Sequence, residues 1–244
     1  MISIDSIDST NRKTKELLVQ GESEGLIVTA RTQTAGRGRK DRSWYSPIGG
    51  LYFSIALKPR IGPEQAPLLG LLSACAVARG IRSLGVENVR LKWPNDVLVQ
   101  QHKIAGILSE SIQVDDNHLR IVVGIGVNQN CPVSEMSEHL RWPTTSIIDE
   151  LGKETSIEAL LCSIVNEMDE LLQAVENDSS YAVVLEEWRR VSSTLGTRVR
   201  IYEDEKTTDG IAKDIGEDGS LIVETDEGLM KVVSGDVAHL GGME

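Results

Sequence analysis

The chain has 244 residues and a formal net charge of −12, and 40% of its residues are hydrophobic but only 4% aromatic. This length suits one large domain or a medium and a small domain, and the composition predicts a mainly aliphatic core. The acidic balance argues against general nucleic-acid binding, which needs a broad basic face. The sequence has neither an apolar run that could span a membrane nor the segments of a signal peptide, so we expect a cytoplasmic protein.

Cysteine and histidine usage predicts neither disulfides nor zinc. The three cysteines, Cys75, Cys131 and Cys162, are odd in number and scattered, which is typical of reduced core thiols in a cytoplasmic protein. The four histidines show no ligand spacing with one another or with the cysteines. We therefore expect no zinc site.

The N-terminal part predicts a helix followed by two strands. Ser9 or Thr10 can cap a helix that ends at Gly21, since hydroxyl side chains accept hydrogen bonds from the free amides of a first turn. Residues 26–32, LIVTART, predict a short buried strand. Apolar side chains alternate in LYFSIAL, which predicts a second strand. The side chains on one face of that strand are Leu51, Phe53, Ile55 and Leu57.

The middle of the chain predicts more strands between two long helices. The first helix begins at Pro63 and continues to Gly85, with apolar residues on several sides. The second covers residues 156–175, where apolar residues recur at helical spacing. The predicted strands lie at 89–93, 97–100, 103–112 and 119–128, with turns at 100–102 and 114–118.

The sequence changes in character after about residue 192. Short alternating segments are broken by Gly and Asp at regular intervals, which predicts a small all-β barrel. We therefore expect an α+β fold with a mixed, mainly antiparallel sheet and helices over residues 1–191. A small C-terminal β-barrel domain is expected over residues 192–244.

A basic loop stands out in this acidic chain. The stretch GRGRK, residues 36–40, places arginines and a lysine between glycines. Glycines let backbone amides approach a ligand closely, and arginine forks match carboxylate and phosphate oxygens. The spacing differs from that of a Walker loop. The stretch is either an anion clamp or a solvated, mobile loop.

The stretch KWPND, residues 92–96, frames the end of a strand with Lys92 and Asp96. A lysine and an aspartate in these places can hold a phosphate and its magnesium ion. The alternative is an ordinary turn in which Asp96 accepts hydrogen bonds from local backbone amides.

Two strand motifs complete the set. KIAG places Lys103 just after a turn, with Gly106 on the same strand; the alternative is a solvated lysine at a sheet edge. GIGVN, residues 124–128, has two glycines within a strand and Asn128 at its end. Glycine weakens a strand, so its presence indicates either that something approaches the backbone closely or that the strand has a bulge.

The order and spacing of these motifs resemble those of the biotin protein ligases. The stretches that carry the resemblance are DSTN (8–11), TQTAGRGRKDRSW (32–44), KWPNDV (92–97), KIAGIL (103–108), GIGVN (124–128) and SGDV (234–237). They extend over essentially the whole chain. The resemblance implies a catalytic domain like that of class II synthetases and a C-terminal barrel like a Src-homology-3 domain.

The resemblance also implies an activity with two half-reactions. Biotin attacks the α-phosphate of ATP, with Mg²⁺ present, to give biotinyl-5′-AMP and pyrophosphate. A lysine of a biotin carboxyl carrier protein or domain then attacks this mixed anhydride. A basic loop suits the first step because a carboxylate and a triphosphate must meet despite their repulsion.

Site residues follow by matching this sequence to the motifs of the family. Lys103, Arg37 and Arg39 are implied as catalytic, and Asp96 as the magnesium ligand. The implied biotin-binding residues are Ser9, Thr10, Asn11, Gln33, Gly36, Arg37, Gly38, Arg39, Lys103 and Gly106. The implied adenylate-binding and ATP-binding residues are Arg37, Arg39, Trp44, Lys92, Asn95, Asp96, Lys103, Ile107 and Asn128. For Trp44 the alternative is a lid over apolar core.

Two features bear on how this chain compares with the family. Asp41 stands where many members carry a glycine or another small residue, which bears on how freely the loop closes. The first motif begins at Asp8, so we expect no N-terminal helix-turn-helix and no operator DNA binding. Family members often dimerise, and the strands 103–112 and 119–128 are candidates for pairing across a twofold axis in a homodimer.

Two other functions fit parts of the pattern. A lipoate or octanoate ligase shares the general fold and the adenylate strategy, but a lipoyl chain prefers an apolar slot, whereas DSTN and Gln33 are polar. A non-enzymatic module, such as a biotin sensor or an interaction protein with a basic loop, has no need of KWPND or Lys103.

Overall fold

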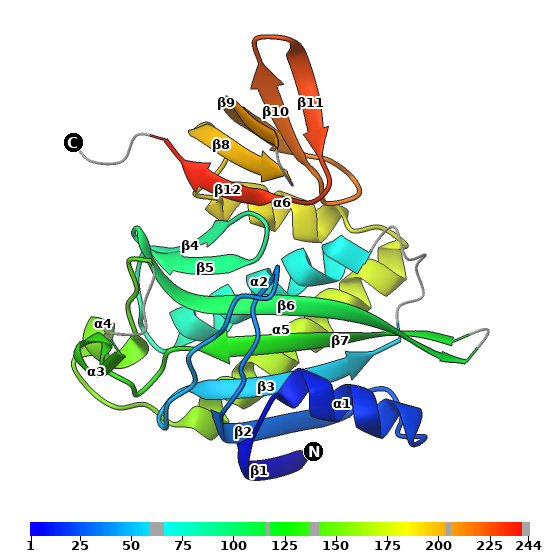
Figure 1. Ribbon diagram of the computed structural model, residues 1–244, viewed down its shortest axis with the longest axis vertical. Helices are drawn as coiled ribbons and strands as arrows, with labels where there is room; N and C mark the ends of the chain where they lie inside the picture. Colours follow the sequence, from blue (N-terminus) through cyan, green and yellow to red (C-terminus); the bar gives the residue numbers. More distant parts are fainter. Residues whose placement is uncertain (59–65, 116–117, 137–141, 204–205, 241–244) are drawn as a thin grey trace.

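The computed structural model describes residues 1–58, 66–115, 118–136, 142–203 and 206–240. A seven-stranded sheet in the order β1-β2-β3-β7-β6-β5-β4 forms the centre of the molecule, and a five-stranded sheet lies beyond the β4–β5 end (Figure 1). The strands of the large sheet are β1 (Ile2–Ile7), β2 (Ile27–Gln33), β3 (Leu51–Leu57), β4 (Val89–Lys92), β5 (Asp96–Val99), β6 (His102–Asp115) and β7 (His118–Val127).

Helices cover both faces of this sheet. Helix α1 lies on the front face in Figure 1, whereas α2 and α5 lie behind the sheet. The helices are α1 (Thr10–Val19), α2 (Ala66–Ser83), α3 (Val133–Met136), α4 (Ile147–Leu151), α5 (Ile157–Asp178) and α6 (Ala182–Val191). Among the described residues, no helix has both the length and the apolar character that a membrane crossing requires.

The sheet is mainly antiparallel, which confirms the predicted α+β class. β1 and β2 pair in parallel, and the neighbours from β2 through β3, β7, β6 and β5 to β4 pair antiparallel. β1 was not predicted, because ISIDSI has only three apolar residues and their alternation breaks at Ser6. The unpredicted helices are α3 and α4, which are too short to show a period, and α6.

Strand β3 shows why the sheet needs helices on both sides. Its predicted face, which includes Phe53 and Ile55, belongs to the main hydrophobic core, which also contains residues of α2. The opposite face is buried as well: Ala56 joins a small cluster with Leu18 of α1. Ser54 lies on the α1 side too, where its hydroxyl is fully buried.

The predicted long helices and hairpins are largely confirmed. Ser9 is the N-cap residue of α1, although its side chain makes no capping hydrogen bond. Ser156 caps α5 by accepting a hydrogen bond from the amide of Ala159 at 3.1 Å. Helix α2 is confirmed, although its predicted start at Pro63 lies outside the described residues. The β5–β6 turn is confirmed, while Asp116 and Asn117 of the β6–β7 turn lie outside the described part. Cys162 of α5 is exposed rather than part of the core, unlike the buried Cys75 and Cys131.

The C-terminal part forms the predicted small antiparallel sheet, in the order β11-β10-β9-β8-β12. Its strands are β8 (Arg198–Glu203), β9 (Lys206–Ile215), β10 (Leu221–Thr225), β11 (Gly228–Val232) and β12 (Asp236–His239). Closure of this sheet into a barrel stays a prediction.

The small sheet packs directly on the end of the large one. Buried residues of both sheets, such as Val199 and Leu91, belong to one hydrophobic cluster. Trp93, in the β4–β5 turn, donates its indole N–H to the carbonyl of Gly219 at 3.0 Å and its backbone N–H to the hydroxyl of Thr194 at 3.0 Å. The packing fixes β12 beside the β4–β5 turn, where the site lies.

Candidate functional site

One cavity of about 650 Å³ collects the predicted site residues. Its walls come from the start of α1, the basic loop, the β4–β5 turn, β6, β7 and β12. The predicted residues that line it are Ser9, Thr10, Asn11, Gln33, Arg37, Gly38, Arg39, Trp44, Lys92, Asn95, Asp96, Lys103, Gly106, Ile107 and Asn128. Residues far apart in the chain therefore share one volume of the size that small-molecule ligands occupy.

Gly36 is the predicted residue that does not line the cavity. A Cβ built at Gly36 would overlap the carbonyl oxygen of Trp44 and lie 2.8 Å from the hydroxyl of Ser46. This glycine thus permits the close backbone crossing at the base of the loop, where the Trp44 amide donates to the Gly36 carbonyl at 2.8 Å.

One end of the cavity is lined by uncharged polar groups. The side-chain carbonyl of Gln33 accepts hydrogen bonds from the amide of Thr10 at 2.9 Å and from its hydroxyl at 3.2 Å. The Gln33 amide donates to the Ser46 hydroxyl at 3.0 Å, and Ser54 donates to the Thr10 hydroxyl at 2.7 Å. These contacts fix the orientation of Thr10 and Gln33 before any ligand binds.

Asn11 uses its polar groups on the protein itself. Its side-chain amide donates to the Leu108 carbonyl at 3.3 Å and to Glu110 Oε2 at 2.8 Å, while its oxygen accepts from Ser54 at 2.6 Å. Both N–H donors are therefore engaged. A Cβ at Gly124 would overlap this carboxamide, so the glycine makes room for it. Direct binding of biotin by Asn11 stays a prediction; its visible role is to order the wall.

Trp44 lies flat against two of the strand glycines. A Cβ at Gly126 would be 2.6 Å from the indole nitrogen, and one at Gly106 would be 2.9 Å from the ring. The indole N–H is buried and has no hydrogen-bond partner in the described part of the chain. The glycines of GIGVN thus accommodate a close approach, as predicted, and the groups that approach are the side chains of Asn11 and Trp44.

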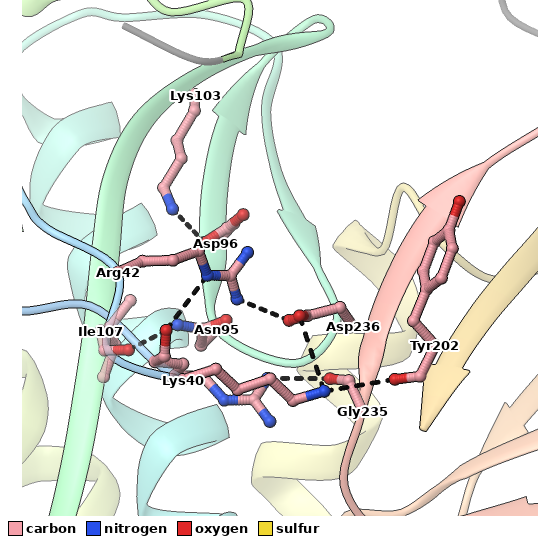
Figure 2. A network of polar contacts seen from close by, with 10 residues as sticks. Lys40, Arg42, Asn95, Asp96, Lys103, Ile107, Tyr202, Gly235 and Asp236 are labelled. Carbon is pink, nitrogen blue, oxygen red and sulfur yellow. Dashed lines mark hydrogen bonds and ion pairs between the residues drawn. The ribbon is translucent and has the colours of Figure 1, made fainter. Parts of the chain in front are cut away.

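Lys103 and Asp96 form an ion pair in the middle of the cavity. Lys103 Nζ lies 2.5 Å from Asp96 Oδ1, and the two side chains are 23% and 24% exposed (Figure 2). Lys103 Nζ is also 5.2 Å from the centre of the Trp44 ring, within the range of a cation–π contact. Lys103 is therefore a half-buried cavity lysine rather than a solvated edge residue.

Backbone and side-chain contacts hold the β4–β5 turn against β6. Asn95 donates its side-chain amide to the carbonyl of Ile107 at 2.7 Å, and the amide of Ile107 donates to the Asn95 carbonyl at 3.0 Å. Burial lowers the pKa of nearby Lys92, an effect that the charge of Asp96 opposes. The turn thus presents Asp96 and a partly desolvated lysine to the cavity.

The far end of the basic loop is bound to the small sheet. Arg42 Nη2 lies 2.6 Å from Asp236 Oδ1, and Lys40 Nζ lies 3.7 Å from Asp236 Oδ2 (Figure 2). Lys40 also donates to the carbonyl of Tyr202 at 3.3 Å, and Arg39 donates to that of Gly235 at 3.1 Å. Loop closure over the cavity therefore depends on residues nearly two hundred positions away in the sequence.

The tip of the loop takes a left-handed backbone conformation. Lys40 and Asp41 have φ values of 52° and 56°, a region that favours glycine and that aspartate tolerates better than most residues. Asp41 therefore fits a position where a small residue is common in the resembled family. The turn it makes brings Lys40 and Arg42 to the same carboxylate, Asp236.

Comparison with known proteins settles the family. Residues 3–128 match the biotin/lipoate A/B protein ligase family, and residues 194–240 match the biotin protein ligase C terminal domain. The chain belongs to this ligase family. The first match covers more than half of the chain, and the second covers the small sheet.

Individual relatives of this ligase are similar to it over nearly the full chain. The bifunctional ligase/repressor BirA of Bacillus subtilis is 32% identical over 97% of this chain and 73% of its own. The biotin–[acetyl-CoA-carboxylase] ligase of Paracoccus denitrificans is 30% identical over 94% of this chain and 96% of its own. The biotin protein ligase of Aquifex aeolicus, solved in complex with biotin and ATP, superposes with a TM-score of 0.86 at 28% identity, covering 99% of this chain and 98% of its own.

Several residues of the ligase cavity were missed by the sequence reasoning. Asp236 and His239 line it from β12, and Ser54 lies beneath its polar end. A signal existed for two of them, because Ser54 interrupts an apolar strand and Asp236 belongs to the SGDV stretch. The position of His239 follows only from the packing of the small sheet.

His239 is a neutral wall residue of the ligase cavity. Burial lowers its pKa to about 4, and the charge of Lys92 adds to this effect. The ring nitrogen Nε2 lies 3.2 Å from the hydroxyl of Thr194. A neutral histidine here avoids adding a further charge to a cavity that already holds several cations.

Proposed function

We propose that this chain is a biotin protein ligase: it activates biotin with ATP to biotinyl-5′-AMP and transfers the biotin to a lysine of a biotin carboxyl carrier domain. The observation that carries the proposal is one cavity whose lining combines uncharged polar groups with cations, Lys103 among them. The relatives named above as ligases for biotin, one of them solved with biotin and ATP, support the same reaction.

The polar end suits the ureido ring of biotin. Such a ring carries two N–H donors and one strong acceptor but no charge, so it pairs with hydroxyl and amide groups. Thr10 and Gln33 are already oriented by their mutual hydrogen bonds. The hydroxyl of Ser9, for which the described residues provide no partner, faces the same cavity. We assign biotin recognition to these side chains and to the loop glycines around Arg37.

The cations of the cavity suit the meeting of two anions. Lys103, Arg37 and Arg39 line the cavity together, and we assign them to the biotin carboxylate and to the charge that develops at the α-phosphate. Burial lowers the pKa of Arg39, although Asp236 opposes the shift. Preorganised cations of this kind act strongly because little reorganisation is needed when the charge develops.

Lys103 reaches a substrate by exchanging one carboxylate for another. Its ammonium group pairs with Asp96, which compensates its charge while leaving it next to the Trp44 ring. A biotin carboxylate offers an equivalent partner. We infer that biotin replaces Asp96 as the counter-ion of Lys103, so that Asp96 becomes available to the nucleotide side.

Asp96 fits the expected magnesium role. Magnesium is usually held by one or two carboxylates together with substrate phosphates and waters, and Asp96 supplies a carboxylate on the cavity wall next to Lys92. The described residues contain no cluster of three or more histidine, cysteine, aspartate or glutamate side chains, so a site built from protein ligands alone is not part of this proposal. When bound, the ion supplies positive charge to the triphosphate.

The second half-reaction needs little from the chain beyond shielding and access. We assign the exclusion of water from the mixed anhydride to the loop and β12, which line the cavity. A neutral lysine amine of the acceptor then attacks the carbonyl carbon and AMP leaves. We assign adenylate contacts to Trp44, Asn95, Ile107 and Asn128, which lie on the walls around this position.

We propose a division into a catalytic domain, residues 1–191, and a small domain, residues 192–244. The matched ranges and the end of α6 at Val191 support this division.

We also keep the homodimer as a proposal, and we narrow its candidate pairing edge from the two strands β6 and β7 to β6. β7 has β3 on one side and β6 on the other from Ile121 to Val127, while β6 beyond Gly106 has a paired strand only on its β7 side within the described residues.

Exchange of labelled pyrophosphate into ATP tests the proposed function without any carrier protein. We expect exchange that requires biotin and magnesium, and none when lipoate replaces biotin. Exchange with lipoate alone would assign the chain to the lipoate branch of the family. Biotin binding without exchange would indicate a sensor rather than a ligase.

A further inference from the structure

Glu110 of β6 is a junction of polar contacts just outside the cavity. Its Oε1 lies 2.7 Å from Lys15 Nζ and 3.2 Å from Arg37 Nη1, and its Oε2 accepts a hydrogen bond from the Asn11 side chain at 2.8 Å. Lys15 and Asn11 belong to α1, whereas Arg37 belongs to the basic loop. One carboxylate therefore connects three separate parts of the chain.

These contacts differ from those of an ordinary surface ion pair, which contributes little. The side chain of Glu110 is only 17% exposed. Burial would raise the pKa of Glu110, but hydrogen bonds from Lys15 and Asn11 and the charges of Lys15 and Arg37 outweigh it and lower the pKa. Two of its three partners, Asn11 and Arg37, line the cavity, while Glu110 itself does not.

Arg37 has little else to fix it. Its hydrogen bond to Glu110 is the one that the Arg37 side chain makes within the described residues, and it uses one of five guanidinium donors. Arg37 stands between Gly36 and Gly38, and an unrestrained arginine side chain has many rotamers to lose when it binds. The remaining donors are free to meet an anion in the cavity.

We propose that Glu110 is a positioning residue for the proposed ligase reaction: it holds the Arg37 guanidinium where the biotin carboxylate would meet the phosphate, and it fixes the Asn11 carboxamide on the cavity wall. It acts through these two residues and touches no substrate. The proposal rests on the proposed function, because it is the biotin carboxylate and its phosphoryl partner that Arg37 is held to meet.

Lys15 provides a matched control. It shares Oε1 of Glu110 with Arg37 and does not line the cavity. If Glu110 were only the counter-ion of a surface charge cluster, removing Lys15 would disturb the site as much as neutralising Glu110. If Glu110 positions Arg37, removing Lys15 leaves that ion pair in place.

The test compares Glu110→Gln with Lys15→Gln by calorimetric biotin binding and by pyrophosphate exchange. For Glu110→Gln we expect biotin affinity to fall about tenfold, since the charged hydrogen bond that orients Arg37 is lost. The KM for ATP should stay within about twofold. Lys15→Gln should leave both quantities within about twofold. Biotin affinity of Glu110→Gln within twofold of the unchanged chain would overturn the proposal.

A double variant shows whether Glu110 acts through Arg37. If it does, Glu110→Gln combined with Arg37→Gln binds biotin about as weakly as Arg37→Gln alone, whereas fully additive losses would contradict the proposal. Glu110→Asp keeps the charge and should recover part of the affinity; it replaces Glu110→Gln if that variant does not fold. Absence of exchange in the unchanged chain would refute the proposed function, while loss of the Glu110 effect in an active chain would refute only this inference.

Discussion

The two ends of the basic loop are held in different ways. At the near end, Arg37 pairs with Glu110, a mostly buried carboxylate of the central sheet that also holds α1. At the far end, Lys40 and Arg42 reach Asp236 of the small sheet, a carboxylate that is 30% exposed where Glu110 is 17% exposed. We infer that order at the Arg37 end of the loop is built into the catalytic layer, while the far end of the loop is held by a second sheet.

Lys103 lines the same cavity as Arg37 and Arg42, and its loss should have the largest effect. Lys103→Ala removes the cation that faces both anions, so biotin-dependent pyrophosphate exchange should fall by about 10²–10³-fold. Lys213→Ala, which removes a lysine paired with Glu224 on the small sheet, is the control. A rate near that of the unchanged chain, in a variant with normal thermal unfolding, would remove Lys103 from the centre of the mechanism.

The far end should carry a pH signature through His239. Its pKa is lowered to about 4 in the folded chain, against about 6.5 when unfolded. Folding thus favours the neutral form of His239. The stability that depends on this neutral form is fully present above pH 6.5 and is lost as the pH falls toward 4. After allowance for solvent screening of this partly accessible ring, on the order of 1–2 kcal/mol of unfolding free energy should disappear in that window.

Urea unfolding at several pH values from 7 to 4 measures this effect. His239→Gln should unfold with a shallower pH dependence than the unchanged chain, because the titrating group is gone and the amide still reaches Thr194. Equal slopes for the two chains would show that His239 is not the group responsible.

The near end can be disturbed without changing any charge. Gly124→Ala places a Cβ against the buried Asn11 carboxamide, and overpacking of this kind costs about 1–3 kcal/mol. We expect a matching loss of stability and a raised KM for biotin. Gly70→Ala in α2 is the control, since its Cβ would meet Ser109 at an ordinary 3.5 Å. Unchanged biotin kinetics in Gly124→Ala would separate Asn11 from biotin binding.

Breaking the far end should have the smallest effect. Asp236→Asn weakens the ion pairs with Arg42 and Lys40, but partly exposed pairs contribute about 1 kcal/mol or less. We expect the KM for ATP to rise less than tenfold, and less still at high salt, which screens such pairs. Glu224→Gln, in an exposed pair of the same sheet, should change nothing. A loss of a hundredfold would mean that the small sheet does more than close the loop.

Much of the fold followed from local sequence patterns, because alternation and helical spacing report burial directly. β3 and α5 have strong patterns and were found at nearly their observed bounds. β1 and the short helices α3 and α4 have too few periodic residues, and they are stabilised by the elements on which they pack.

The sequence predicted which residues line the cavity, but not which residues contact one another. Motif order placed Arg37, Asp96 and Lys103 in one cavity, and the structure agrees. The pairing of Arg37 with Glu110 joins residues 73 positions apart, and that of Arg42 with Asp236 joins residues 194 apart. No local pattern encodes such distances. They arise when α1, the loop and the small sheet pack on the central sheet.

The walls of the cavity include both Ser9 and His239, and this placement bears on how the enzyme is made. During synthesis the N-terminal elements emerge first and can begin to fold, yet the pocket lacks one wall until β12 has left the ribosome. The cations of the loop then have no carboxylate from the small sheet to meet. Activity should therefore arise late and in one step, and a nascent chain that stops short of residue 236 should carry every predicted cation of the site without a closed site.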